Sequence, residues 1–122
     1  MDERQLPRWE INKEAKVWIQ QMEGFSNCII EDMNLKGMCV SFSERLPRLK
    51  SVRMSFAIED NSEPIKIEAQ IPWNREEQGR YYYGLSFSQI DDDGKNRIYQ
   101  YLSANCYDQF KKKWWGEERV SQ

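Results

Sequence analysis

Two arginines near the start of the chain, Arg4 and Arg8, lie four residues apart in the stretch ERQLPRW. This spacing would place both on one face of a helix, but Pro7 disfavours a helical conformation in the residue before it and removes a backbone donor. We therefore expect an extended segment, in which residues four apart again point the same way, roughly 13 Å from each other at about 3.3 Å per residue. Two guanidinium groups held in this way could straddle a small ligand with more than one anionic group.

A second polar stretch, DMNLKG, runs from Asp32 to Gly37, where one predicted strand turns into the next. A purely structural interpretation is that Asp32 and Asn34 bond their own backbone and that Gly37 adopts a positive φ angle. For the stretch taken alone this structural interpretation is the favoured one, but a functional interpretation is open as well. The stretch offers a carboxylate acceptor, an amide that donates and accepts, and a glycine that lets a ligand approach the backbone, a set suited to the edge of a purine base.

Composition indicates one domain of 122 residues with a core of its own. The 18 basic and 20 acidic residues are interspersed and give a net charge of −2, so we expect no nucleic acid polymer as a partner. No apolar run approaches the roughly 20 residues that span a bilayer, and we expect no membrane insertion. The predicted location is the cytoplasm.

The absence of histidine removes the commonest general base and the commonest metal ligand. The chain also lacks a phosphate-cradling glycine loop and an evident nucleophile with its base, so we expect no enzyme and no metal. Cys28, Cys39 and Cys106 lack the close pairing of zinc or redox motifs. We expect them to be small apolar residues in a reducing compartment.

From about residue 13, apolar and polar residues alternate with a period of two, which is typical of half-buried antiparallel strands. The pattern predicts six strands around 17–19, 28–30, 38–42, 52–58, 65–73 and 81–87. On the fifth strand it predicts one buried face made of Ile65, Ile67, Ala69, Ile71 and Trp73. Six strands with no helix between them indicate a barrel or a sandwich.

The period changes after Ile90, where Asp91, Asp92 and Asp93 are suited to the N-terminus of a helix rather than to a metal site. Ile98, Leu102, Cys106 and Phe110 then recur every four residues. This spacing predicts one C-terminal helix packed on the strands. Lys111, Lys112 and Lys113 would complement the negative end of that helix.

The order R-x-x-x-R and then D-x-N-x-x-G resembles the PilZ family of cyclic di-GMP receptors, whose pattern is R-x-x-x-R followed by [D/N]-x-[S/A]-x-x-G. The stretches QIPW and YYYGLSF and the final helix are similar to the same family. The resemblance implies an all-β fold with a C-terminal α-helix, a six-stranded antiparallel β-barrel. It implies a flexible arm over residues 1–12, the barrel and helix over 13–113, and a tail over 114–122.

The resemblance also implies roles for individual residues. Arg4 and Arg8 would clamp cyclic di-GMP, and Asp32 would accept hydrogen bonds from the N1–H and amino groups of guanine. Asn34 would take the place of the family's serine, and Gly37 would keep the geometry of the turn. The implied function is that of a bacterial signalling receptor or adaptor, with no cofactor besides this ligand, whose arm reorders on binding and regulates an unidentified downstream protein.

Two other classes of function compete with this interpretation. One is a PilZ-like protein-interaction module that does not bind the nucleotide and that docks a partner through exposed aromatic residues such as Trp114 and Trp115. The other is a binder of single-stranded nucleic acid, which small antiparallel barrels often are. The net charge of −2 disfavours the second alternative.

Overall fold

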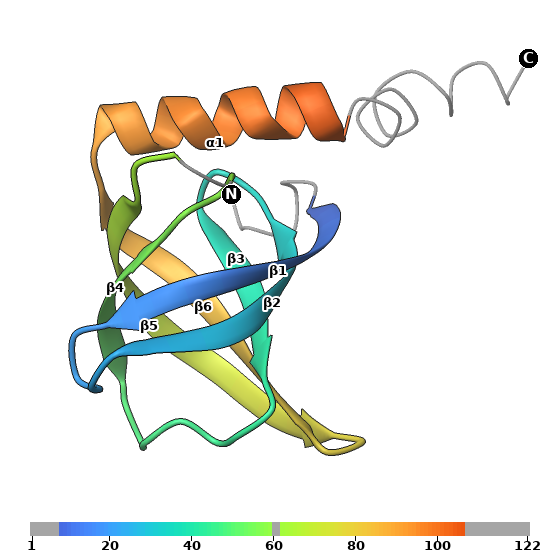
Figure 1. The fold of residues 1–122 in the computed structure, drawn as a ribbon, viewed down its shortest axis with the longest axis vertical. Coiled ribbons are helices and arrows are strands. Elements are labelled where there is room, and N and C mark those ends of the chain that lie inside the picture. The colour runs from blue at the N-terminus through green and yellow to red at the C-terminus, as the bar shows by residue number, and fades with distance from the viewer. Residues whose placement is uncertain (1–7, 60–61, 107–122) are drawn as a thin grey trace, which may run out of the picture.

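The computed structural model describes residues 8–59 and 62–106. Six antiparallel strands form a closed barrel, and one helix follows them (Figure 1). The elements are β1 (Trp9–Ile19), β2 (Phe25–Met33), β3 (Gly37–Phe42), β4 (Ser51–Phe56), β5 (Ile65–Glu77), β6 (Arg80–Ile90) and α1 (Asp92–Asn105). The predicted fold class is confirmed. Phe110, the three lysines after it and the tail lie outside the described residues.

The strands follow the order β1-β2-β3-β6-β5-β4 around the barrel. A short antiparallel pairing between β1 and β4 closes it, in which Val17, Trp18 and Ile19 face Phe56, Ser55 and Met54. β5 and β6 form a long hairpin whose tip extends past the rest of the barrel (Figure 1).

The interior follows the predicted alternation. Side chains of every strand meet in one apolar core, among them Val17, Ile30, Val40, Val52, Ile67 and Leu85. α1 lies across one end of the barrel (Figure 1) and buries Ile98 and Leu102 against this core, together with Cys106 directly after the helix. At about 1.5–3 kcal/mol for each fully buried aliphatic side chain, the barrel and the helix stabilise one another through this core.

The N-terminus of α1 is capped as predicted. The Asp91 carboxylate accepts a hydrogen bond from the backbone N–H of Gly94 at 2.7 Å, and Asp92 and Asp93 occupy the first turn. These carboxylates complement the positive end of the helix dipole. The acidic trio therefore has a structural explanation at the start of the helix.

β1 begins at Trp9, four residues before the expected boundary between arm and barrel. Glu10 pairs with Asp32 and Lys13 pairs with Ile30, so two residues of β1 oppose one residue of β2. Asn12, inside this bulge, has a φ angle of 50°. Because a bulge interrupts the period of two, the alternation in the sequence becomes readable only after it.

The prediction that Trp73 shares the buried face of Ile65 is wrong. Trp73 is 38% exposed, whereas Ile65, Ile67 and Ala69 are buried. Gln70 pairs with Ser86 and Trp73 pairs with Gly84, so β5 has one more residue than β6 in this interval. The extra residue turns the Trp73 side chain to the outer surface of the barrel.

The three cysteines are free and buried, as predicted for small apolar residues. Burial raises the pKa of the Cys28 thiol to about 12, with a smaller opposing effect from Arg80. It also raises the pKa of Cys106. These thiols are therefore protonated at neutral pH.

Within the described ranges, α1 is too short and too polar to cross a membrane.

Candidate ligand-binding site

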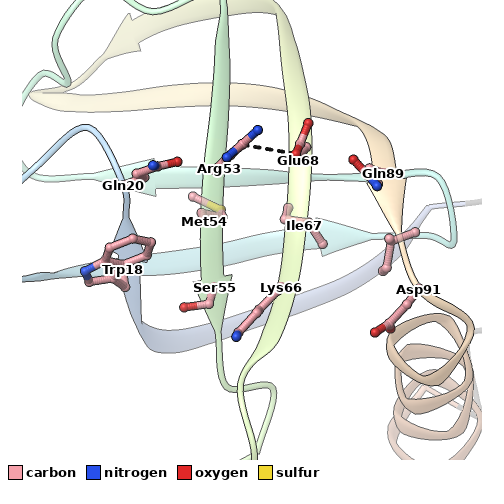
Figure 2. A pocket seen from close by; sticks show the side chains of 11 residues that line it. Trp18, Gln20, Arg53, Met54, Ser55, Lys66, Ile67, Glu68, Gln89 and Asp91 are labelled. Atoms are coloured by element: carbon pink, nitrogen blue, oxygen red, sulfur yellow. Dashed lines mark ion pairs between the residues drawn. The ribbon is translucent and has the colours of Figure 1, made fainter.

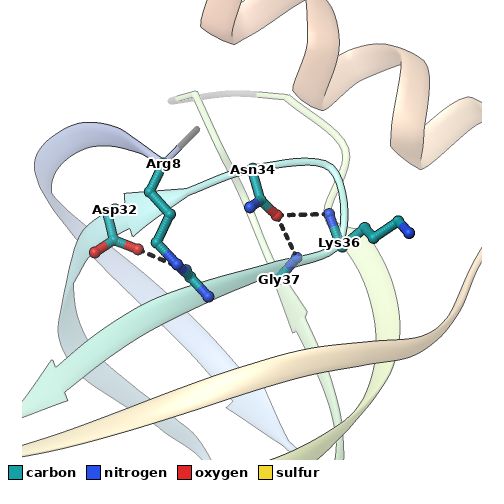
Figure 3. A network of polar contacts seen from close by, with 5 residues as sticks. All are labelled: Arg8, Asp32, Asn34, Lys36 and Gly37. Atoms are coloured by element: carbon teal, nitrogen blue, oxygen red, sulfur yellow. Dashed lines mark hydrogen bonds and ion pairs between the residues drawn. The ribbon is translucent and has the colours of Figure 1, made fainter. Parts of the chain in front are cut away.

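The two polar motifs meet at one point on the barrel. Arg8 directly precedes β1 and Asp32 lies near the end of β2, 24 residues later. Arg8 Nη1 donates to Asp32 Oδ1 at 2.8 Å (Figure 3). The two side chains are 42% and 28% exposed, so both remain accessible to a ligand. Arg4 lies outside the described residues.

Asp32 faces outward because β2 contains a bulge. Ile30 pairs with Val40 and Asp32 pairs with Cys39, which leaves Glu31 as an extra residue. After this bulge the facing of the side chains is reversed: Met33 is fully buried in the core, and Asp32 lies on the outer surface beside Arg8. The bulge therefore places the carboxylate where an arm preceding β1 can reach it.

Asn34 closes the turn between β2 and β3. Its side-chain Oδ1 accepts hydrogen bonds from the backbone N–H groups of Lys36 at 2.7 Å and Gly37 at 2.9 Å (Figure 3). Its own backbone N–H donates to the carbonyl of Gly37 at 2.9 Å. The prediction that the Asn34 side chain bonds the backbone of its own turn is thus confirmed for its oxygen.

Gly37 does not adopt the positive φ angle that the structural interpretation assumed. Among the glycines of the described ranges, only Gly24 and Gly79 do so. The requirement at Gly37 is instead a close approach to β6, since a Cβ atom there would lie 2.2 Å from the carbonyl oxygen of Leu85. Any side chain at this position would push β3 away from β6.

A continuous row of residues crosses the outer surface from the Arg8 side. The register aligns Asp32 on β2, Cys39 on β3, Gly84 on β6 and Trp73 on β5. The indole of Trp73 covers Gly84, where a Cβ atom would come within 2.2 Å of the ring. Between Asp32 and the Trp73 indole the row therefore carries only the small side chain of Cys39, which we call the floor of the row. Sequence reasoning missed this row, although a glycine inside a strand is a signal of close approach.

A second arginine lies beyond this floor. The Arg75 guanidinium carbon lies 5.3 Å from the centroid of the Trp73 ring and 4.9 Å from that of Tyr82. Its Nε is 3.4 Å from Glu77 Oε1. Stacking between two aromatic rings holds the cation in place on the outer surface.

Burial and the charged groups nearby shift the pKa of the Cys39 thiol. Burial is the largest cause that raises the pKa of the Cys39 thiol, to about 11, and Asp32 and Glu31 raise it further. Arg75 and Arg8 act on the same thiol and lower its pKa.

One hollow in the surface lies next to the site and another lies away from it. A groove of about 660 Å³ runs beside the β2–β3 turn and is lined in part by Leu35, Lys36, Phe87 and Lys95. Another hollow, of about 500 Å³, lies over β4 and β5 (Figure 2) and contains the ion pair between Arg53 Nε and Glu68 Oε2 at 3.1 Å. Of the predicted site residues that the structure describes, Arg8, Asp32, Asn34 and Gly37, none lines the hollow over β4 and β5.

The fold and this site define a small antiparallel barrel with a helix at one end and a polar, cationic surface beside the β2–β3 turn. The model of the PilZ domain family matches residues 2–104. The chain belongs to the PilZ domain family. PilZ domains are binding and adaptor modules.

Solved structures share this fold. The inhibitor of motility MotI (DgrA) of Bacillus subtilis matches with a TM-score of 0.67 and 19% identity over 93% of this chain and 54% of that protein. PlzA of Borreliella burgdorferi, in complex with c-di-GMP, matches with a TM-score of 0.56 and 18% identity over 82% of this chain and 41% of PlzA. The chain thus spans about half the length of these two proteins.

The PilZ domain of YcgR from Escherichia coli, with c-di-GMP, matches with a TM-score of 0.65 and 11% identity. The match covers 92% of this chain and 97% of that domain. No curated protein matches the chain in sequence.

Proposed function

We propose that the chain is a cyclic di-GMP receptor that holds its ligand between the N-terminal arm and the outer surface of the barrel beside Asp32. One observation carries the proposal: Arg8 of the first motif and Asp32 of the second are in direct contact at 2.8 Å, in a chain of the PilZ family. Two of the similar structures, PlzA and YcgR, contain c-di-GMP.

Arg8 and Asp32 supply complementary chemistry to such a ligand. A guanidinium can pair with phosphate oxygens, bond the O6/N7 edge of guanine and stack on a base, and a lysine cannot do all three. Asp32 supplies acceptors for the N1–H and amino groups of guanine. Their mutual ion pair is exposed to solvent, so it stabilises the free protein by no more than about 1 kcal/mol and is readily exchanged for ligand contacts. We assign the same clamping role to Arg4.

The row across the outer surface extends the site. We propose that the ligand lies over the floor formed by Cys39, with a base against the exposed part of the Trp73 ring. Stacking of a base on an aromatic side chain contributes about 1–3 kcal/mol. Arg75, held over Trp73 at 5.3 Å, would add a cation to the far side of a ligand with two phosphates.

The proposed output is a change in the surface that the protein presents to a partner. The arm with Arg4 continues directly into Arg8, so a ligand that engages both arginines fixes the path of the arm across the barrel. A downstream protein with different affinities for the free and bound surfaces would read this change. We propose that this occurs in the bacterial cytoplasm.

Isothermal titration of the purified chain with cyclic di-GMP tests the proposal, with GTP and cyclic di-AMP as controls. Selective heat of binding supports the receptor and gives the stoichiometry in the same experiment. Absence of heat, together with a melting temperature that cyclic di-GMP leaves unchanged, refutes it. The protein-interaction module that does not bind the nucleotide would then be the better account.

A further inference from the structure

Ser41 is a polar residue on the outer side of the barrel that nevertheless has no exposure to solvent. It lies on β3 between Val40 and Phe42, which both belong to the core, so its own side chain points outward. Its bonding partners are Glu31 and Arg80. They come from β2 and β6, the two strands that flank β3.

The hydroxyl of Ser41 forms all the hydrogen bonds that it can. Its Oγ accepts from Arg80 Nε at 3.1 Å and from Arg80 Nη2 at 2.9 Å, and it donates to Glu31 Oε2 at 2.7 Å. Because a hydroxyl has two acceptor positions and one hydrogen, the two arginine bonds leave the hydrogen for Glu31. Arg80 Nη2 also donates to the backbone carbonyl of Ser41 at 2.9 Å, which holds the guanidinium against β3.

Glu31 is the residue of β2 that most needs such a bond. The pairing of β2 with β3 passes from Ile30 directly to Asp32, so the described strands give Glu31 no partner residue on β3. An unpaired bulge residue interrupts the ladder of hydrogen bonds and loosens the strand locally. The bond from Ser41 ties this residue to β3 through its side chain instead.

The bulge decides where the Asp32 carboxylate points. Ile30 and Met33 are both fully buried, which regular alternation does not permit for residues three apart. The bulge resolves this conflict and leaves Asp32 on the outer surface, where its Oδ1 accepts from Arg8 at 2.8 Å. The direction of Asp32 therefore depends on how the bulge is held.

We propose that Glu31, Ser41 and Arg80 are positioning residues: their hydrogen bonds anchor the bulge of β2 and hold the Asp32 carboxylate in its outward direction. The inference deepens the proposed function and, for its effect on the ligand, rests on it. Glu31 and Asp32 both raise the pKa of the Cys39 thiol, so the two carboxylates lie around the same part of the surface. Their tasks differ, since Asp32 meets the ligand and Glu31 is bound to Ser41.

The substitutions Glu31→Ala and Glu31→Gln separate anchoring from charge. Both remove the same negative charge, but only glutamine keeps a side-chain oxygen that accepts from Ser41. Isothermal titration gives the affinity of each full-length variant for cyclic di-GMP. We expect the alanine variant to bind about 3- to 10-fold more weakly than the glutamine variant, a part of the loss of about 10- to 100-fold expected when the Asp32 acceptor itself is removed. Equal affinities of the two variants overturn the inference.

The same two substitutions in an Asp32→Ala background show whether Glu31 acts through Asp32. A general loss of barrel stability would weaken binding in both backgrounds. Anchoring of Asp32 predicts that the difference between alanine and glutamine at position 31 disappears once the Asp32 carboxylate is absent. A difference that persists undiminished overturns the inference.

Thiol labelling tests the anchoring without any ligand. In Asp32→Cys the added thiol reports the exposure of position 32, because Cys28, Cys39 and Cys106 are all buried, and the unmodified chain gives the background rate. We expect this thiol to react about threefold more slowly with Glu31→Ala than with Glu31→Gln, since a bulge that is not anchored lets the side chain turn towards the core. Equal rates overturn the inference.

The labelling rates also distinguish failure of the inference from failure of the proposed function. If the unmodified chain does not bind cyclic di-GMP but the two labelling rates differ as expected, the receptor function is contradicted and the anchoring of the bulge is supported.

Discussion

Replacing Arg8 by alanine separates the stability of the barrel from the binding of its ligand. Arg8 contacts Asp32 at 2.8 Å, and both side chains are partly exposed, at 42% and 28%. A solvated ion pair of this kind contributes at most about 1 kcal/mol. The Arg8→Ala variant should therefore fold normally, with a melting temperature lower by no more than a few degrees.

The expected loss of binding is larger. A charge-assisted hydrogen bond to a phosphate or a base contributes about 1.5–3 kcal/mol. The ion pair that the ligand must displace reduces this by up to about 1 kcal/mol. The net effect corresponds to a cyclic di-GMP affinity weaker by about one to two orders of magnitude. Arg8→Lys keeps the charge without the planar fork, so we expect an intermediate affinity.

Isothermal titration of the variant measures this loss, and Arg53→Ala is the matched control. Arg53 also forms an exposed ion pair on the barrel surface, with Glu68 at 3.1 Å, in the hollow of Figure 2. Its removal changes the net charge by the same amount and should leave the affinity unchanged. If Arg8→Ala binds cyclic di-GMP as tightly as Arg53→Ala does, Arg8 does not clamp the ligand and the reasoning fails.

Three further outcomes follow from the packing. Gly37→Ala would bring Cβ within 2.2 Å of the Leu85 carbonyl oxygen, so we expect a loss of about 1–3 kcal/mol in urea unfolding; an unchanged midpoint would contradict the close approach. Burial raises the pKa of Cys28 from 9.0 to about 12, so between these pH values the thiol is protonated in the folded protein and ionised in the unfolded one. The free energy of unfolding should therefore fall as the pH rises from about 9 to 12. Native-state thiol labelling at pH 8 as fast as in urea would refute this burial. Asp91→Ala removes the acceptor for Gly94 N–H and should cost about 1 kcal/mol, whereas Asp91→Asn, which keeps a capping oxygen, should cost less.

The interior of the barrel could be predicted because each strand carries its own local signal. Val52, Met54 and Phe56 alternate with polar residues, and all three are buried. The helix could also be predicted from neighbouring residues alone, since Asp91 caps it and Ile98 lies on its buried face. No information about which strands pair is needed for either inference.

The site was predicted only in part, because part of it depends on pairing. Arg8 and Asp32 were identified from two motifs whose resemblance to a family predicted their proximity, and the contact is present. Trp73 and Arg75 come from a strand that pairs with β6 and not with β2. Their position in the same row as Asp32 follows from the order and register of the strands, which the alternation of residues does not specify.

The bulges account for what the sequence pattern could not show, and they also create the proposed binding surface. Strict alternation would continue Cys28 and Ile30 into Asp32 and would place this carboxylate in the core; the extra residue Glu31 turns it outward. Strict alternation would likewise bury Trp73, and the irregularity after Gln70 exposes it. Since one added residue reverses the facing of every side chain that follows, the positions where the pattern fails are the positions where the barrel surface acquires its acceptor and its aromatic face.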